Sequence, residues 1–587
     1  MTPLAAYADR LSVRPGETVR FHGAGAAGVL PHAAIHRVVC ADPNPAIGSV
    51  QTTDTGAPLT AHQLSPQRVP LGSFAEVGGA VGRLAQLEAF TVLMRVKCTR
   101  LPSGAHVSAI LSSAEAGNGG GGASLVVHVT SEGVLSINGR DSSVRLPFGD
   151  WSLIAVSVDR GAKEVALSAG LIDGPRVTVF VTTDNVAFHP TAPLRFASEG
   201  HAATTPAFNG LIERPMIFDR VLTADDIVGV DRAATARDDG LVACWDFARD
   251  MSSDRIVDIG PHALHGTLIN TPTRAVRGSR WTGREMAWRH APDEYAAIRF
   301  HDDDIDDCAW PVVASFTVPE DFVSGQYALM LDAEGAKENV PFWVVPPKGR
   351  PTAKIAVLVS TFTYCVYGNH ARPEWSMDPE WQQAWRDQTS AWNAYPHNPG
   401  DHADLGLSTY NTHTDGAGIS IASWHRPMLN LRLGFLTYPY ADIRASGLRH
   451  YPTDTHLTMW LEAKSFDYDI ITDWELHHEG RDLLDAYQVV LTGTHPEYHT
   501  REMLDALQGY RDGGGRFCYF GGNGFYWKIA LSPTRDGVVE IRRAEGGIRA
   551  WAAEPGEYYN QFDGAYGGLW RRNGRPPQHL TGVGFSA

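Results

Sequence analysis

Residues 354–360 read KIAVLVS, an uninterrupted apolar run typical of a strand buried on both faces of a parallel sheet. Similar runs follow at 468–472, 489–492 and 516–520. Helical patterns separate them. One begins at Thr500, which can cap its first turn, and ends at the glycines 513–515. This alternation predicts a parallel sheet with helices on both faces.

The residues that follow these strands are the first candidates for chemistry, because ligands of such sheets bind beyond the carboxyl ends of the strands. The first strand continues into 361–369 (TFTYCVYGN), the third into 493–499 (GTHPEYH) and the fourth into 521–527 (GGNGFYW). A long segment without clear periodicity, about 368–455, is dense in His, Tyr, Trp and Pro. Irregular segments of this length inside a domain are usually functional.

The turn after the third strand carries no nucleophile. It has no G-x-S-x-G sequence and offers His495 and Glu497 in place of serine or cysteine, while Cys518 lies inside a predicted strand. No H-E-x-x-H helix is present either, since 477–479 lacks the second histidine at the required spacing. The groups that remain are a carboxylate, a histidine and phenols, which favour metal-assisted hydrolysis over covalent catalysis.

Upstream of residue 350 the chain reads as β-structure. Short alternating strands at 11–21 and 310–346 predict one immunoglobulin-like sandwich made of 1–73 plus 285–349. An insertion, 74–284, interrupts it. Its sequences GDWSLIAVSVDR (149–160) and NGLIERPMIF (209–218) resemble laminin-G or concanavalin-like sandwiches, many of which bind no sugar. The predicted fold class is therefore multidomain β plus α/β, with the catalytic α/β domain at 350–587. The parallel sheet of this domain resembles that of glutamine amidotransferase domains.

Composition limits the classes of function. The chain has 587 residues, enough for three or four domains, and a net charge of −16, which disfavours nucleic acid and anionic lipid as partners. Its six cysteines form no C-x-x-C pair, which excludes a zinc ribbon and a disulfide framework. Without a signal peptide or an apolar run of ~20 residues, a cytoplasmic location is expected. The acidic run 302–307 is read as a calcium site, a solvated loop or an interface element.

Several motifs together resemble the N,N-dimethylformamidase large (catalytic) subunit family. They are GTHPEY (493–498), FGGNGFYW (520–527), LGLSTYNTH (405–413), AEPGEYY (553–559) and FHDDD (300–304). The resemblance covers nearly the whole chain, although family large subunits usually extend further. It implies an amidohydrolase that converts N-substituted formamides such as N,N-dimethylformamide to formate and dimethylamine, with a small partner subunit in an (αβ)2-type assembly.

The resemblance also implies a mononuclear Fe(III) ion held by two tyrosines and one glutamate. The matching positions here are Glu497, Tyr410 and Tyr367, with Tyr364 as the alternative second phenol. Phenols have a pKa near 10, so two phenolates require a hard, highly charged cation, and oxygen-only ligands suit Fe(III). Open ligand positions would then accept water and the substrate carbonyl.

The same resemblance assigns an acid/base role to His495 and a substrate-orienting amide to Asn523. A departing dimethylamine must gain a proton, which requires a general acid. The aromatic run 525–527 could form a small apolar box around the substrate.

Other interpretations stay open at this point. A buried tyrosine is usually a packed ring, Glu497 could favour a helix N-terminus, and Asn523 could be a turn residue. Two functional alternatives also remain: a non-catalytic carbohydrate-binding protein that uses the laminin-G-like region, and a related amidase with another small amide substrate.

Overall fold

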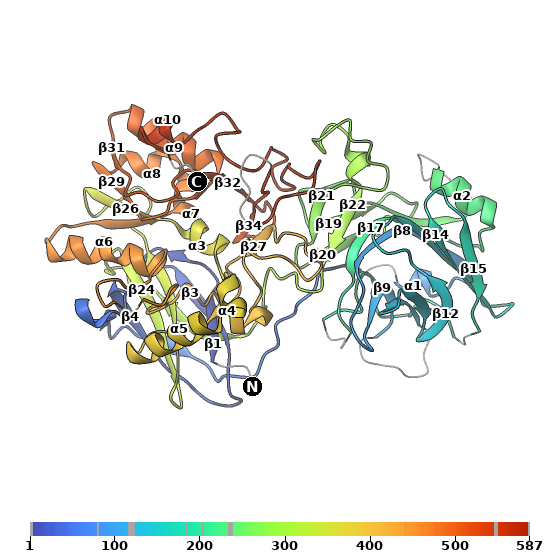
Figure 1. The fold of residues 1–587 in the computed structure, drawn as a ribbon, viewed down its shortest axis with the longest axis horizontal. Coiled ribbons are helices and arrows are strands. Elements are labelled where there is room, and N and C mark those ends of the chain that lie inside the picture. The colour runs from blue at the N-terminus through green and yellow to red at the C-terminus, as the bar shows by residue number, and fades with distance from the viewer. Residues whose placement is uncertain are drawn as a thin grey trace.

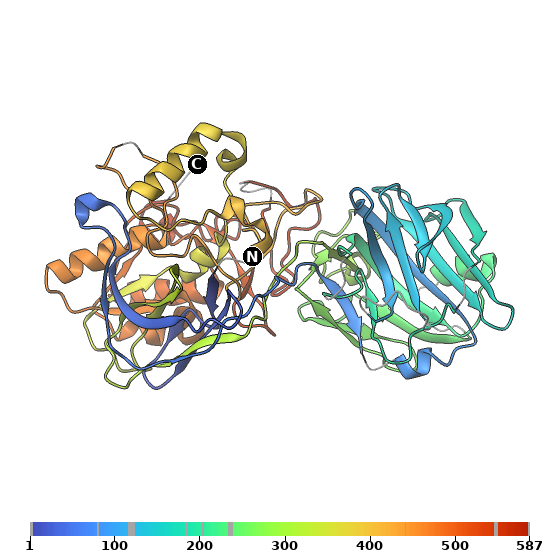
Figure 2. The same cartoon turned by 90° about the horizontal axis from the view of Figure 1, so that it is seen from below.

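The ribbon forms two lobes that lie side by side (Figure 1), and the view from below shows the same separation (Figure 2). The computed structural model describes residues 4–78, 81–115, 124–182, 185–201, 205–232, 239–440, 442–544 and 550–584. One lobe holds the inserted residues, and the other holds the remaining N-terminal strands together with the C-terminal region. Strands make up most of the regular structure among these residues.

Segments from both sides of the insertion form two sheets in the lobe that also holds the C-terminal region. Strand β3 pairs antiparallel with β23, and β4 pairs antiparallel with β24. Buried Phe21, Phe316 and Phe342 lie in the core between the sheets. The sheets are β1 (Ala5–Ala8), β3 (Thr18–Ala24), β23 (Val312–Thr317) and β6 (Thr60–Ala61), and β2 (Ser12–Val13), β25 (Ala336–Val344), β24 (Gly325–Ala333), β4 (His32–Cys40) and β5 (Gln51–Asp54).

The inserted lobe is a β-sandwich, as its sequence predicts. Buried Val92, Ile154 and Trp245 belong to one apolar core between its layers. The strand order is β12 (Arg140–Arg145), β11 (Val134–Ile137), β10 (Leu125–Thr130), β9 (Val107–Ser113), β16 (Leu194–Phe196), β7 (Phe74–Val77), β20 (Gly266–Ile269), β19 (Arg255–Asp258), β18 (Leu241–Asp246), β17 (Asn209–Phe218), β8 (Ala89–Arg100), β13 (Ser152–Asp159), β14 (Glu164–Leu171) and β15 (Arg176–Phe180).

Further elements complete this lobe. Strand β22 (Ala297–Phe300) follows the insertion in sequence but pairs with β17 and with β21 (Thr273–Val276). The chain therefore leaves the insertion along the edge that faces the other lobe. Two helices, α1 (Val81–Leu84) and α2 (Ala224–Arg232), lie at the periphery.

The four apolar runs of the C-terminal region form one parallel sheet. Its order is β28 (Asp469–Thr472), β26 (Ile355–Val359), β29 (Val489–Thr492) and β31 (Arg516–Cys518). The helices around it are α3 (Thr361–Val366), α6 (Tyr451–Ala463), α7 (Asp473–Glu479), α8 (Arg481–Asp485), α9 (Arg501–Asp512) and α10 (Gln578–Thr581). Thr500 caps α9 by accepting from the Met503 amide, and Gly513 ends the helix.

The predicted glutamine amidotransferase-like α/β domain is not supported. Among the described residues the parallel sheet has four short strands, and much of 393–440, 442–450 and 550–577 has no regular structure. The remaining strands form two small separate sheets, β27 (Ile421–Ser423) with β34 (Val538–Glu540) and β33 (Ala530–Leu531), and β30 (Tyr498–His499) with β32 (Trp527–Lys528). Helices α4 (Pro373–Met377) and α5 (Pro379–Ala391) pack beside the irregular segment. No helix among the described residues is long and apolar enough to span a bilayer.

The acidic run 302–307 joins the lobes. The Asp303 carboxylate accepts from His413 at 2.7 Å, and the Asp302 carboxylate accepts from the Thr414 hydroxyl at 2.6 Å. Asp306 pairs with Arg535. These partners all come from the C-terminal region, so the run is an interface element, one of the three interpretations that the sequence left open.

A buried ion pair ties α6 to the end of β4. His456 Nε2 lies 2.9 Å from Asp42, whose side chain is 1% exposed. The hydrogen bond to Asp42 raises the pKa of His456 from 6.5 to about 9. Because the folded-state pKa is raised, the pair stabilises the fold fully below pH 6.5, and this contribution is lost as pH rises from 6.5 to about 9.

We therefore predict that His456→Gln lowers the free energy of unfolding at about pH 6 by roughly 1 kcal/mol, since the ring is partly exposed, and has little effect at about pH 10. Urea unfolding at both pH values measures this difference. The exposed His262→Gln variant is the control. An equal loss at both pH values would contradict the assignment.

Candidate functional site

Three oxygen-bearing side chains from three segments meet in the C-terminal region. The hydroxyl oxygens of Tyr367 and Tyr410 are 2.5 Å apart. Tyr367 donates to Glu497 Oε2 at 2.9 Å, and Tyr410 donates to Glu497 Oε1 at 3.3 Å. We call Tyr367, Tyr410 and Glu497 the oxygen cluster. The structure thus brings together the three residues that the sequence nominated as metal ligands.

Tyr367 owes its position to the first strand of the parallel sheet. Strand β26 leads directly into α3, and Tyr367 is the C-terminal cap of that helix. Its amide donates to Thr363 O at 3.1 Å. The ring stacks on that of Tyr410 with centroids 4.1 Å apart and an interplanar angle of 18°. The side chain is 2% exposed, so its hydroxyl is held within the cluster and away from solvent.

Tyr410 lies on the irregular segment, which is anchored by two buried polar side chains. Arg426 donates to the carbonyl oxygens of Gly368, Gly406 and other loop residues. Asn369 Nδ2 donates to Gly406 O at 3.1 Å and to Pro427 O at 2.8 Å. These bonds satisfy carbonyls that no strand or helix pairs, and they fix the loop that carries Tyr410 against α3.

Glu497 follows β29 and is fixed through its backbone. Its amide donates to the Thr363 hydroxyl at 3.2 Å, and its carbonyl accepts from the amides of Tyr526 and Trp527. The side chain is 1% exposed. Because Thr363 belongs to α3, the same helix positions both Glu497 and Tyr367.

Asn523 contacts the carboxylate of the oxygen cluster. Its Nδ2 donates to Glu497 Oε1 at 3.2 Å. The loop before it lies against the turn at Thr494 because position 522 is glycine: its φ is +79°, and a Cβ there would lie 2.0 Å from Thr494 O. The following Phe525 and Trp527 are buried, at 1% and 0% exposed.

His495 makes no hydrogen bond to the oxygen cluster within the described part of the chain. Its Nδ1 lies 3.3 Å from the Thr494 hydroxyl. The ring of His450 stands between, 5.7 Å from the His495 ring and 4.2 Å from the Tyr367 ring. Burial and then the charge of Arg449 lower the pKa of His495 to about 4, so its imidazole is neutral at physiological pH.

Tyr364, the alternative second phenol, has another partner. It donates to Asp454 Oδ2 at 2.5 Å. Asp454 Oδ1 accepts from the amide and the hydroxyl of Thr494 at 2.7 and 2.8 Å. Tyr364 therefore helps to hold the turn that carries His495, whereas Tyr367 faces Tyr410 and Glu497.

Sequence reasoning missed the residues that surround the cluster. The Tyr498 hydroxyl is 2.6 Å from that of Tyr410. Arg543 lies over the Tyr410 ring at 4.3 Å, and Arg449 over the Tyr367 ring at 4.8 Å. Tyr498 directly follows Glu497, and its position in the HPEY motif was the only signal that could have identified it. The two arginines carry no such signal.

His450 is the fourth residue that the sequence did not indicate. Its backbone adopts φ 57° and ψ −126°, which is unusual for a side chain other than glycine. Its Nε2 is buried without a hydrogen-bond partner among the described residues. Strain of this kind persists where the surroundings impose it, often at functional sites.

The oxygen cluster fits a hard cation. Its two hydroxyl oxygens are 2.5 Å apart, and they lie 2.9 and 3.3 Å from the two carboxylate oxygens of Glu497. These distances are close to the spacing of neighbouring ligands around an ion with metal–oxygen distances of about 2 Å. Burial, followed by the Glu497 charge, raises the pKa of Tyr410 to about 12 and that of Tyr367 well above its usual value. Both phenols therefore need a strong Lewis acid to ionise near neutral pH.

Among the described residues, His301, Asp304 and His413 form a second cluster whose side chains lie close enough together to hold a metal ion. Its two imidazole rings stack at 3.6 Å with an interplanar angle of 6°. Parallel rings direct their lone pairs in parallel, not toward one ion. His413 Nδ1 and His301 Nδ1 instead face the carboxylates of Asp303 and Asp304. We interpret this cluster as a charged contact between the lobes.

Comparisons with known proteins find matches for two parts of the chain and for nearly its whole length. Residues 273–587 match the family model described as N,N-dimethylformamidase beta subunit-like, C-terminal. Residues 74–228 match the concanavalin A-like lectin/glucanases superfamily. The chain is 32% identical over 625 residues to the N,N-dimethylformamidase beta subunit of Paracoccus aminophilus, covering 99% of this chain and 79% of that protein.

A second relative is the N,N-dimethylformamidase beta subunit of Alcaligenes sp, 32% identical over 617 residues, with the same shares of the two chains covered. The relatives are named beta subunits where the sequence predicted a large subunit, so the family agrees and the subunit name differs. Among solved structures, the Ruminococcus gnavus IT-sialidase CBM40 bound to α2,3 sialyllactose is 16% identical, covers 27% of this chain and 92% of its own, and has a TM-score of 0.23. That likeness carries no functional argument.

Arg543 should contribute strongly to the geometry of the site. It is fully buried and lies over the rings of Tyr410 and Trp527, and its Nη2 donates to Tyr498 and to Thr409 O. We predict that Arg543→Met lowers the free energy of unfolding by about 2–4 kcal/mol, since at least two buried hydrogen bonds lose their donor.

Urea unfolding followed by tryptophan fluorescence measures this loss. The exposed Arg444→Met variant, which removes only a surface pair with Asp442, should change stability by less than about 0.5 kcal/mol. Similar values for both variants would show that Arg543 does not hold the site together.

Proposed function

The chain belongs to the N,N-dimethylformamidase beta subunit family, and we propose that it is the catalytic subunit of an enzyme that hydrolyses N-substituted formamides. For N,N-dimethylformamide the reaction is HCON(CH3)2 + H2O → formate + dimethylammonium. The oxygen cluster supports this proposal best, because two phenols and a carboxylate are buried within hydrogen-bond distance of one another.

We propose that Tyr367, Tyr410 and Glu497 hold one Fe(III) ion. Their oxygen-only donor set and mutual distances suit a small, hard cation. Arg449 and Arg543 lie over the two phenol rings, where their positive charge favours the phenolate forms. When bound, such an ion supplies Lewis acidity to the amide carbonyl and to an attacking water.

The surrounding residues hold these donors in place. Asn523 Nδ2 donates to Glu497 Oε1, and the Tyr498 hydroxyl meets that of Tyr410. The Asn523 amide, predicted to orient the substrate, is therefore also engaged in fixing the carboxylate. Burial of the cluster excludes bulk water, which strengthens electrostatic interactions at the reacting carbon.

His495 is proposed as the acid/base group. A tertiary formamide has no N–H, so its nitrogen must gain a proton as it leaves. The neutral imidazole can take a proton from the attacking water and then deliver it to the dimethylamine nitrogen. The network Tyr364–Asp454–Thr494 holds the turn that carries this ring. The His450 ring packs edge-on against His495 and at a tilt against Tyr367, which fixes the distance of His495 from the cluster.

We also propose that a partner subunit completes the enzyme, in an (αβ)2-type assembly. The support is the name of the relatives, which are beta subunits of N,N-dimethylformamidase. Native mass spectrometry of the protein from its own source cells would show the partner directly.

The reaction itself is tested by supplying N,N-dimethylformamide to the iron-loaded protein with its partner and measuring formate and dimethylamine. Equal amounts of the two products are expected. Amine release no faster than without protein would reject hydrolysis of this substrate, and parallel trials with N-methylformamide and acetamide would show whether another small amide is used.

Tyr367→Phe and Tyr410→Phe should each remove a ligand. We predict loss of most bound iron, loss of the visible phenolate-to-iron absorption band, and a fall in activity of roughly 100-fold or more. Metal analysis and visible spectroscopy give these readouts without an activity assay.

Tyr364→Phe is the matched control, because it removes a phenol one helical turn away that bonds to Asp454. It should keep the iron and the absorption band while losing about 1–2 kcal/mol of stability. Iron loss in Tyr364→Phe but not in Tyr367→Phe would reverse the assignment.

His495→Gln should separate acid/base chemistry from metal binding. We predict a fall in kcat of roughly 10²–10⁴-fold with iron content and absorption band unchanged. The neighbouring turn variant His499→Gln is a poor control because that ring is buried, whereas the partly exposed His477→Gln leaves the turn intact. Unchanged kcat in His495→Gln would remove the histidine from the mechanism.

A further inference from the structure

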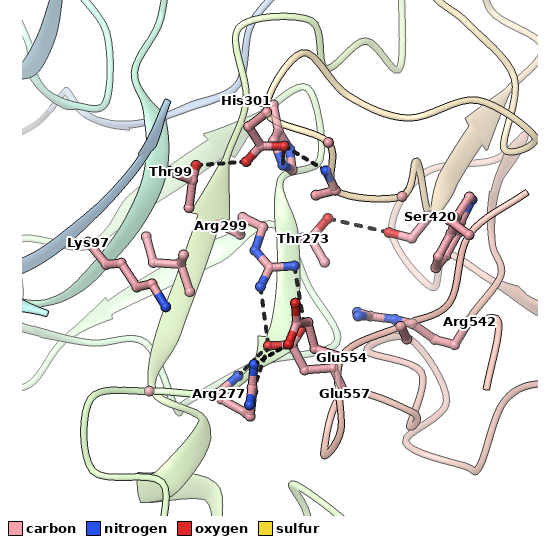
Figure 3. A pocket seen from close by; sticks show the side chains of 18 of the residues that line it. Lys97, Thr99, Thr273, Arg277, Arg299, His301, Ser420, Arg542, Glu554 and Glu557 are labelled. Carbon is pink, nitrogen blue, oxygen red and sulfur yellow. Dashed lines mark hydrogen bonds and ion pairs between the residues drawn. The ribbon is translucent and has the colours of Figure 1, made fainter. Parts of the chain in front are cut away.

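A cavity of about 550 Å³ lies between the two lobes, outside the oxygen cluster. Figure 3 shows its lining side chains. Lys97 on β8 comes from the inserted sandwich, Arg299 from β22, and Arg542 and Glu557 from the C-terminal region. A volume of this size fits a small organic molecule. None of the roles assigned above uses this space.

The acidic side chains of the cavity are already engaged. Glu557 accepts from Arg277 Nε at 3.4 Å and pairs with Arg299 at 3.2 Å. Glu554 accepts from Arg277 Nη2 at 2.7 Å. Asp415 accepts from the Thr99 hydroxyl at 2.7 Å and from the Ala417 amide at 2.9 Å. The cavity therefore has little acceptor capacity left for a cation.

Its donors, in contrast, are in excess. Arg299 Nε is buried without a hydrogen-bond partner. Arg542 uses Nε for Glu540 and Nη2 for Arg274 O, and its Nη1 has no hydrogen-bond partner among the described residues. Within the same residues Lys97, which lines the cavity, makes no side-chain hydrogen bond or ion pair. In Figure 3 the ends of Lys97 and Arg542 extend from opposite sides toward the Arg299–Glu557 pair.

The arrangement of these donors indicates the charge of the ligand. Three cationic side chains from three segments line one space, in a chain whose net charge is −16. Both Nη atoms of Arg299 already bond Glu557, so Lys97 and Arg542 supply the unused N–H groups there. An oxyanion head can accept from all of them, and charge-assisted hydrogen bonds are the strong kind. Neutral polar ligands would leave the Lys97 charge uncompensated.

The aromatic residues that line the cavity indicate the shape of the uncharged part of the ligand. Trp151, Trp281 and Trp551 line the cavity. Arg277 covers one face of Trp281, with its guanidinium 4.9 Å from the ring centroid. Trp551 packs directly on Gly418, where any Cβ would lie 1.9 Å from the indole. Aromatic walls of this kind suit a flat apolar body attached to the charged head.

We propose that this cavity binds a small organic anion with a carboxylate or phosphate head and a flat ring body. The head lies between Lys97, Arg299 and Arg542, and the ring lies against the tryptophans. The site is distinct from the oxygen cluster. Trp551 connects the two, since its indole N–H donates at 2.9 Å to the carbonyl oxygen of Thr409, the residue before Tyr410. The inference does not depend on the proposed amide hydrolysis.

Isothermal titration of the full-length protein with benzoate and with phenyl phosphate tests the proposal, and benzyl alcohol is the neutral comparison. At least one anion should bind, and benzyl alcohol should bind about tenfold or more weakly. Which of the two anions binds more tightly identifies the head group. Absence of binding by both anions would overturn the proposal, as would equal binding of benzyl alcohol.

Lys97→Gln tests the placement, since this side chain gives up no recorded contact on substitution. It should weaken binding of the anion about tenfold and leave the melting temperature unchanged. Exposed Lys464→Gln is the matched control and should bind as the parent does. Tyr410→Phe should also bind as the parent does. Binding lost in Tyr410→Phe but kept in Lys97→Gln would place the anion at the oxygen cluster and refute the cavity site.

Discussion

The burial of Arg426 is the constraint on which the site depends. Its guanidinium donates to carbonyls of Gly368, Leu405, Gly406, Leu407 and Ser423. A segment without strands or helices must still pair its buried carbonyls, and here one side chain at 1% exposure does so for several. Tyr410 lies between Leu407 and Ser423 in the chain. Its hydroxyl can therefore meet those of Tyr367 and Tyr498 only if the loop is fixed first.

Without a cation, burial of the oxygen cluster destabilises the fold. Glu497 and the two phenols are buried, and burial raises the pKa of the Glu497 carboxyl. Arg449 and Arg543 offset part of this cost by lying over the phenol rings. The left-handed backbone of His450 adds strain at the same place. Such costs are typical of sites organised for binding and not for stability.

The sequence predicted some strands and site residues and missed others, and the physical reason differs from case to case. The apolar runs around 354–360 and 489–492 become β26 and β29, since continuous apolar character directly reports burial on both faces. Tyr364 and Tyr367 were not distinguishable, because they are one turn apart and the end of α3 decides which faces Tyr410. Arg449 and Arg543 were missed because a buried cation stacked on a ring leaves no periodic or motif signal. The amidotransferase-like domain was overpredicted, because four strands determine a sheet but not the long irregular segments around it.

The inserted sandwich reaches the oxygen cluster through one loop. His301, at the end of β22, stacks on His413, and Thr99 of the sandwich donates to Asp415. Residues 413–415 lie only a few positions beyond Tyr410, and Trp551 from the cavity wall donates to Thr409 O. The loop that carries Tyr410 is therefore held from both lobes. Arg426 bonds it on one side, and His301 and Asp303 contact its residue His413 on the other. Movement between the lobes would pull on Tyr410 before any other member of the cluster, because Tyr367 and Glu497 are fixed by α3 within a single lobe.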